Sequence, residues 1–380
     1  MILPPIALYI HIPWCLKKCP YCDFNSHEKH GEIPEKAYIE QLLFDLNTQR
    51  HYIQNRPIHS IFIGGGTPSL FSADSYDHLF GQLRNILNIP HDIEITLEAN
   101  PGAIDVEKFT SYRDMGINRL SIGVQSFQDH QLKKLGRIHR ADQAKTAVIA
   151  AKKAGFDRIN LDLMFGLPDQ TIEDALSDLQ IAMQLSPSHL SWYQLTIEPN
   201  TFFHRFPPSL PNDDLRFDMQ IAGQDFLSQN QFKQYEISAY AFNQDYSQHN
   251  LNYWLFGDYL GIGAGAHAKF TELSASHIIR RWNTKHPKQY LQTNARHLFE
   301  THIITQKELP LEFMMNALRL QQPISIKLFE DRTGLNIKDI EKPLNQATTL
   351  ELLHTDHQQF RLTHKGRLFL NEVLTLFLDL

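Results

Sequence analysis

Runs of apolar and often β-branched residues recur along the first half of the chain, and helical spacing of apolar positions fills the intervals between them. This alternation predicts a parallel sheet covered by helices, that is, an α/β fold. The predicted strands are 7–12, 60–63, 94–97, 119–124, 159–164 and 190–195. The predicted helices between them are 37–46, 76–87, 106–115, 141–153 and 173–185.

Glycines follow two of these helices, at Gly116 and Gly155, where a left-handed cap ends a helix a few residues before the next strand. The positions of these glycines therefore agree with the predicted alternation of strands and helices. Periodicity does not report whether the sheet closes, so an open doubly wound sheet and a barrel both remain possible at this point.

The pattern changes after about residue 200. A helix is predicted at 213–228, followed by a mixed region with the glycine-rich run 261–265. From residue 309 the pattern predicts helices, a strand pair around 352–362 and a last helix at 365–378, which resembles a small winged-helix domain. We predict three segments, at 1–235, 236–308 and 309–380.

Composition narrows the class of protein. The 36 Lys and Arg residues are outnumbered by 42 Asp and Glu, and no long basic run occurs, which argues against a nucleic-acid surface. No apolar stretch approaches the roughly 20 residues that span a bilayer, so we expect at most peripheral membrane contact. The apolar residues 2–12 are interrupted by Pro4, Pro5 and His11 and lack the flanks of a signal peptide. These features predict a cytoplasmic protein.

The chain has only three cysteines, Cys15, Cys19 and Cys22, all in the loop after the first predicted strand. A disulfide framework would use an even number, so this cluster indicates a metal centre. A closed zinc site needs a fourth ligand, for which His11 or His27 is available. Three thiolates on an iron-sulfur cubane leave one iron open to another ligand, and we favour this alternative.

Polar or glycine residues follow several predicted strands. The run Gly64-Gly65-Gly66-Thr67-Pro68 follows one strand, and Glu98, Gln125 and Asp162 lie at the ends of others. Missing side chains in the glycine run would let backbone N–H groups approach a ligand, although no Gly-Lys-Ser/Thr follows to make it a phosphate loop. Because the carboxyl ends of parallel strands form the ligand-binding face, we expect these residues to converge with the cysteines.

The segments YIHIPWC through Cys22-Asp-Phe-Asn, GGGTP, LEANP, GVQSF and LDLMFGLP occur in order, and together they resemble the radical S-adenosylmethionine (SAM) family. The resemblance to one branch of this family, the heme chaperones and the related oxygen-independent coproporphyrinogen III oxidases, covers essentially the whole chain. It implies a partial (β/α)6 TIM-like barrel, a 4Fe-4S cluster on Cys15, Cys19 and Cys22, and SAM on the open iron. By motif, it implies SAM-pocket roles for Tyr9, Tyr21, Gly65, Gly66, Thr67, Glu98, Gln125, Arg137 and Asp162.

Two features separate branches of this family. Oxygen-independent coproporphyrinogen III oxidases have Cys-x-Cys where this chain has Cys22-Asp23-Phe24, whereas His249 to Trp254 matches the HNxxYW motif of the related heme chaperones. That resemblance implies heme binding, with His249 as a candidate ligand. Because the chain has 20 histidines, others remain candidates, among them His267.

The expected function is heme binding and transfer to apo-hemoproteins such as respiratory enzymes, with the oxidase as the alternative. A reductant such as a flavodoxin is a further expected partner. We assign no catalytic residue.

Overall fold

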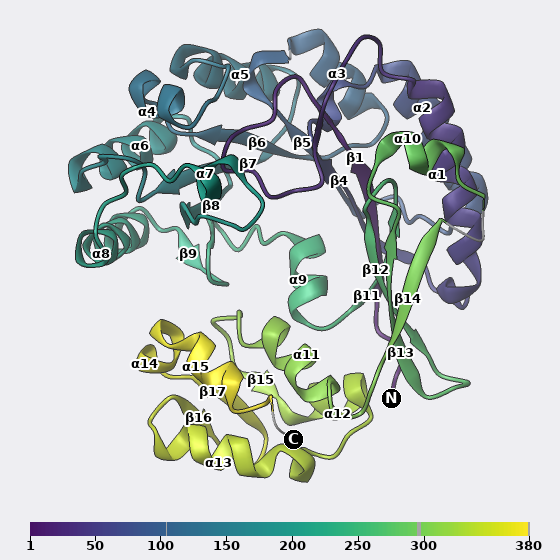
Figure 1. The fold of residues 1–380 in the computed structure, drawn as a ribbon, viewed down its shortest axis with the longest axis vertical. Coiled ribbons are helices and arrows are strands. Elements are labelled where there is room, and N and C mark those ends of the chain that lie inside the picture. Colours follow the sequence, from purple (N-terminus) through teal and green to yellow (C-terminus); the bar gives the residue numbers. More distant parts are fainter. Residues whose placement is uncertain (104, 295–297, 379–380) are drawn as a thin grey trace.

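The computed structural model describes residues 1–103, 105–294 and 298–378. Its centre contains the six predicted strands, which lie side by side and parallel, so the predicted α/β fold is confirmed. In sheet order the strands are β1 (Ile6–Ile12), β4 (Ile58–Gly65), β5 (Glu94–Ala99), β6 (Arg119–Gln125), β7 (Arg158–Phe165) and β8 (His189–Gln194). The outer face is covered by helices α1 (Glu35–Gln49), α2 (Ala73–Ile86), α3 (Val106–Asp114), α5 (Ala141–Lys153) and α6 (Ile172–Gln184) (Figure 1).

Alternation along the strands separates the two faces of this sheet. Apolar side chains such as those of Leu97 and Leu120, which are register partners on β5 and β6, are fully buried in the main core. Polar residues occupy alternate positions, and Asp162 on β7 pairs in register with Ser191 on β8. Because successive side chains of a strand point to opposite faces, these polar residues share one face of the barrel.

The sheet continues beyond the six strands at both ends. Beside β1 lies the parallel strand β11 (Asp258–Ile262), followed by antiparallel β12 (His267–Glu272), β13 (His277–Asn283) and β14 (Phe299–Ile304). Beside β8 lie β10 (Ala239–Ala241) and β9 (Lys233–Gln234). The order therefore runs from β14 to β9 without closing, which makes the barrel partial. The sequence pattern did not predict these added strands.

The last part of the chain packs around a second hydrophobic core that includes Phe313, Phe329 and Phe360. Its helices are α11 (Leu309–Ala317), α12 (Ile326–Thr333) and α13 (Glu341–Thr349), and its sheet has the order β15 (Ile324–Ser325), β17 (Gln359–Leu362), β16 (Leu353–Thr355). The predicted helix at 365–378 is wrong, because Phe369 (φ −112°, ψ 38°) divides it into α14 (His364–Leu368) and α15 (Leu370–Thr375). The winged-helix likeness and the three segment boundaries stay predictions.

Shorter elements complete the chain, together with α8 (Asp213–Gln229), whose predicted position is confirmed. They are α4 (Asp129–Lys134), α7 (Phe202–Arg205), α9 (Gln248–Trp254), α10 (Pro287–Gln292), β2 (Trp14–Cys15), β3 (His27–Glu28) and the 3-10 turns Arg50–Ile53, Pro68–Leu70, Pro101–Ala103 and Ile337–Ile340. Helix α9 lies between the barrel and the C-terminal helices (Figure 1). Within the described residues, no helix has both the length and the apolar character needed to cross a bilayer.

Candidate functional site

The cysteine loop leaves β1 and is held at its base by the parallel pair β2 and β3, in which Cys15 faces Glu28. Inside it, the backbone N–H of Cys22 donates to the carbonyl of Cys19 at 3.1 Å, which turns the chain between these two thiols. All three thiols are half-buried, and none is in a disulfide. The loop therefore presents three free sulfur ligands from one short segment.

All three cysteines line a cavity of about 300 Å³ at the carboxyl ends of the strands. The expected convergence is confirmed for most of the predicted residues. Those that line the cavity with the cysteines are Tyr21, Gly65, Gly66, Thr67, Glu98, Gln125, Arg137 and Asp162. Sequence reasoning missed several polar neighbours there, namely Ser121, Ser191, Tyr193 and Ser238. Three of these lie at alternate positions of β6 and β8, a signal that strand periodicity offers once the register is known.

The thiols suit a cationic centre. Burial is the main cause that raises the pKa of Cys15 to about 11, and it also raises the pKa of Cys22. A metal ion reverses such a shift, because thiolates bind metals in the deprotonated form. No three His, Cys, Asp or Glu side chains among the described residues converge on a single ion position. A cubane does not require such convergence, because each thiolate binds a different iron.

Glu98 is a half-buried carboxylate that has no cationic partner among the described residues. Its Oε2 accepts a hydrogen bond from the backbone N–H of Gly65 at 2.9 Å. Burial, and next the negative charge of Asp162, raise the pKa of Glu98 to about 8. Burial also raises the pKa of Asp162, which accepts hydrogen bonds from Ser121 and Asn160. The two carboxyl groups therefore suit a ligand that brings positive charge and hydrogen-bond donors.

Arg137 supplies the opposite charge in the same cavity. Its Nη1 lies 3.6 Å from Cys19 Sγ and its Nη2 donates to the carbonyl of Gly123 at 2.7 Å. Its Nε is buried and has no partner among the described residues. A buried orphan donor on a guanidinium suits a carboxylate ligand. Acidic and basic groups in one cavity thus match a zwitterion such as the methionine part of SAM.

The glycine run plays a different part from the one predicted. The N–H groups of Gly65, Gly66 and Thr67 donate to Glu98, to the carbonyl of Ile12 and to the carbonyl of Trp14. The prediction that these N–H groups face a ligand is therefore wrong. Glycine is required for packing instead, because a Cβ on Gly65, whose φ is +116°, would lie 2.6 Å from the ring of His11.

A second, larger cavity of about 720 Å³ adjoins the first. Five residues line both of them, namely Cys22, Phe24, Ser26, Gly65 and Glu98. Tyr9, predicted in the SAM pocket, lines the larger cavity only, and its hydroxyl donates to Nδ1 of His11 at 2.9 Å. Phe24, which stands where the oxidases have a cysteine, is exposed and lies in the shared wall.

His249 lines neither cavity and is buried on α9. Its Nδ1 shares a hydrogen bond with Ser60 Oγ at 3.0 Å and its Nε2 with Tyr253 Oη at 2.8 Å. Both ring nitrogens are thus occupied, as expected for a structural histidine. The prediction of His249 as a heme ligand is not supported by this geometry, because ligation would break one of the two bonds.

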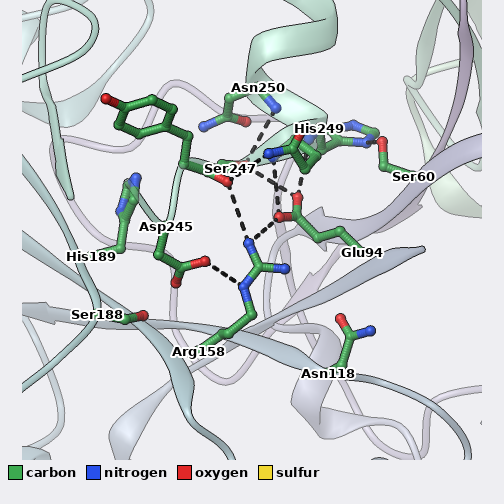
Figure 2. Close-up of polar contacts among 12 residues, drawn as sticks. Ser60, Glu94, Asn118, Arg158, Ser188, His189, Asp245, Ser247, His249 and Asn250 are labelled. Carbon is green, nitrogen blue, oxygen red and sulfur yellow. Dashed lines mark hydrogen bonds and ion pairs between the residues drawn. The ribbon is translucent and has the colours of Figure 1, made fainter. Parts of the chain in front are cut away.

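The start of α9 is held by a carboxylate at the base of the barrel (Figure 2). Glu94 accepts from the backbone N–H groups of Gln248 and His249, at 3.1 and 3.0 Å, and from Arg158 Nη2 at 2.8 Å. Negative charge at a helix N-terminus satisfies free N–H groups and complements the helix dipole. The motif helix is therefore anchored by charge-assisted hydrogen bonds to a buried carboxylate.

The other end of α9 contacts the C-terminal region. The guanidinium of Arg319 lies 4.3 Å from the ring centre of Trp254 and pairs with Glu236 at 3.3 Å. The side chain of Arg332 on α12 donates to the carbonyl of Leu255 at 3.3 Å. The HNxxYW segment thus joins the barrel to the C-terminal helices.

Comparison with known proteins agrees with this geometry. Residues 9–181 match the Radical SAM superfamily, and residues 304–369 match the HemN C-terminal domain. The chain is 50% identical to "Heme chaperone HemW" of Haemophilus influenzae, covering 99% of this chain and 98% of that protein. The chain belongs to the HemW family. The HemW of Escherichia coli is 48% identical, with 99% of both chains covered.

The HemW fold is shared with a solved structure, the coproporphyrinogen III oxidase HemN from Escherichia coli, with a TM-score of 0.84. The match covers 99% of this chain and 90% of HemN at 23% identity, so it bears on the fold alone. Membership of the radical SAM superfamily brings a 4Fe-4S cluster and SAM as cofactors, as the sequence motifs predicted. The resemblance to the heme chaperone branch is likewise confirmed.

Proposed function

We propose that the chain is a heme chaperone, which binds heme and transfers it to apo-hemoproteins. We further propose that the recipients are respiratory enzymes. The observation that carries the proposal is the full-length identity of 50% to a protein named a heme chaperone. The sequence Cys22-Asp23-Phe24 supports it, because the second cysteine of the oxidases is replaced by an exposed aromatic side chain. A cytoplasmic location and a reductant of the flavodoxin type belong to the same proposal.

In this proposal Cys15, Cys19 and Cys22 would hold the cluster, and three thiolates would leave one iron open to SAM. Arg137 would pair with the carboxylate of SAM, Glu98 would accept from its amino group, and Asp162 would accept from its ribose hydroxyls. Tyr21 and Gln125 line the same cavity, and Gly65, Gly66 and Thr67 shape its floor. The cluster and SAM supply redox chemistry when they are bound, while the protein fixes their position.

The proposal is tested with full-length protein reconstituted anaerobically. Loaded with heme, it is mixed with the apo form of a b-type respiratory cytochrome, and the Soret band reports transfer; an equal amount of free hemin is the control. We expect the chain to deliver heme faster than free hemin does. In a parallel reaction with SAM and coproporphyrinogen III, formation of protoporphyrinogen would reject the chaperone in favour of the oxidase.

A further inference from the structure

The larger cavity has the properties of a porphyrin site. Its volume of about 720 Å³ lies within the roughly 300–1,000 Å³ typical of sites for organic ligands. Aromatic side chains line it, namely Tyr9, Phe24, Tyr253 and Tyr259. The rings of Tyr253 and Tyr259 meet edge to face at 4.6 Å, and Phe24 is 63% exposed. Such surfaces suit a large flat aromatic ligand.

Three histidines line this cavity, and their hydrogen bonds distinguish them. Both ring nitrogens of His11 are occupied, by Tyr9 Oη and by the carbonyl of Asn25, each at 2.9 Å. His27 uses Nε2 with Asn25 Oδ1 at 3.2 Å, and its ring packs against that of His286.

His267 differs from the other two. Its ring has no hydrogen bond or ion pair with any described residue, and its one ring contact is with Trp282, at 6.5 Å between centroids. A free imidazole in a cavity wall is open to a metal.

The chain around His267 fixes its position. His267 begins β12, and a Cβ on Gly261 would lie 1.8 Å from the carbonyl oxygen of His267, so only glycine allows this approach of β11 and β12. Gly265, at φ +74°, packs against the side chain of Asn25 in the cysteine loop. The glycine-rich segment therefore holds His267 and the cysteine loop against each other.

Two lysine side chains also line the larger cavity. Lys18 is occupied, because its Nζ donates to the carbonyls of Phe24 and Ser26. Lys285 also lines the cavity, and its Nζ has no acceptor among the described residues. Heme carries two propionate groups, and a free ammonium at the edge of an aromatic cavity suits one of them.

We propose that this cavity is the heme site, with His267 as the axial ligand and Lys285 pairing with a propionate. This assignment rests on the proposed heme chaperone function. His249 then acts as a positioning residue, because it holds the hydroxyl of Tyr253 in the wall of the cavity. The cargo site and the cluster site are neighbours that share Phe24 and Glu98.

The test is a hemin titration of the full-length protein, followed by absorbance and by electron paramagnetic resonance of the ferric iron. For His267→Ala we expect affinity about tenfold or more weaker, with a shifted Soret band and a changed ferric spin signal. Exogenous imidazole should restore the original band. His277→Ala is the matched control, since His277 lies on the neighbouring strand β13, pairs with Glu272 and does not line the cavity.

Lys285→Glu should weaken hemin binding while leaving the Soret position unchanged, because it alters a propionate contact and not the ligand. The site assignment would be overturned if His267→Ala kept the wild-type spectra and affinity, or if Lys285→Glu had no effect. Either result would leave the proposed heme-binding function standing. Absence of hemin binding by the wild-type chain would instead overturn the proposed function.

Discussion

Glu94 offers the sharpest test of how the motif helix α9 is held. Its side chain is 1% exposed and accepts from the N–H groups of Gln248 and His249 and from Arg158. In Glu94→Gln an amide NH2 replaces one oxygen and faces donors on either side, so at least one buried donor loses its acceptor. The ion pair with Arg158 is lost at the same time.

The magnitude follows from these contacts. An unsatisfied buried donor costs about 1–3 kcal/mol, and breaking a buried ion pair by removing one partner costs about 3–5 kcal/mol. Arg158 keeps its second partner, Asp245, which places the expected loss near the lower figure, about 3 kcal/mol. With a urea slope of about 3 kcal/mol/M, the unfolding midpoint falls by about 1 M.

The assay is urea unfolding followed by circular dichroism and by tryptophan fluorescence, to which Trp254 on α9 contributes. The matched control is Glu40→Gln, which removes an ion pair with His78 in which both side chains are about half exposed. That change should alter the free energy of unfolding by about 0.5 kcal/mol or less. Equal midpoints for the two variants would refute the role of Glu94 as the anchor of α9.

Three further predictions concern the cluster cavity. Cys19→Ser should lower the iron content and the visible absorbance after anaerobic reconstitution; full retention of the cluster would contradict its role as a ligand. Because burial raises the pKa of Glu98 from an ordinary 4.5 to about 8, SAM-free protein should lose stability as the pH rises through this range. Glu98→Gln should flatten that slope in thermal unfolding from pH 5 to 9, and an unchanged slope would exclude Glu98 as its source. Gly65→Ala should cost about 2–4 kcal/mol in urea unfolding, because its Cβ overlaps the ring of His11 at a positive φ; a neutral effect would contradict the packing role.

Local sequence patterns predicted the six parallel strands because each strand is a run of apolar residues that periodicity detects. They also predicted the convergence of Glu98, Gln125 and Asp162, because strand ends share one edge. The strands β11 to β14 were missed because their pairing depends on contacts across the sheet, such as that of β11 with β1. No local pattern reports such a partner.

The hydrogen-bond partners of individual polar groups were harder to predict. The N–H groups of Gly65 to Thr67 were expected to face a ligand, yet they bond to the chain near β1 and to Glu98. His249 matched a motif, but its two hydrogen-bond partners come from β4 and from its own helix. Whether a polar atom is free or occupied depends on tertiary neighbours, which composition and spacing do not encode.

The partition between the two cavities has a thermodynamic consequence. Phe24 and Glu98 line both cavities, so a molecule bound in one cavity contacts residues of the other, and these two residues can couple the two sites. Such coupling is reciprocal: if SAM alters the affinity for cargo by some factor, cargo alters the affinity for SAM by the same factor. A radical SAM architecture can therefore serve as a sensor that links cofactor occupancy to loading and release, without any bond in the cargo being made or broken.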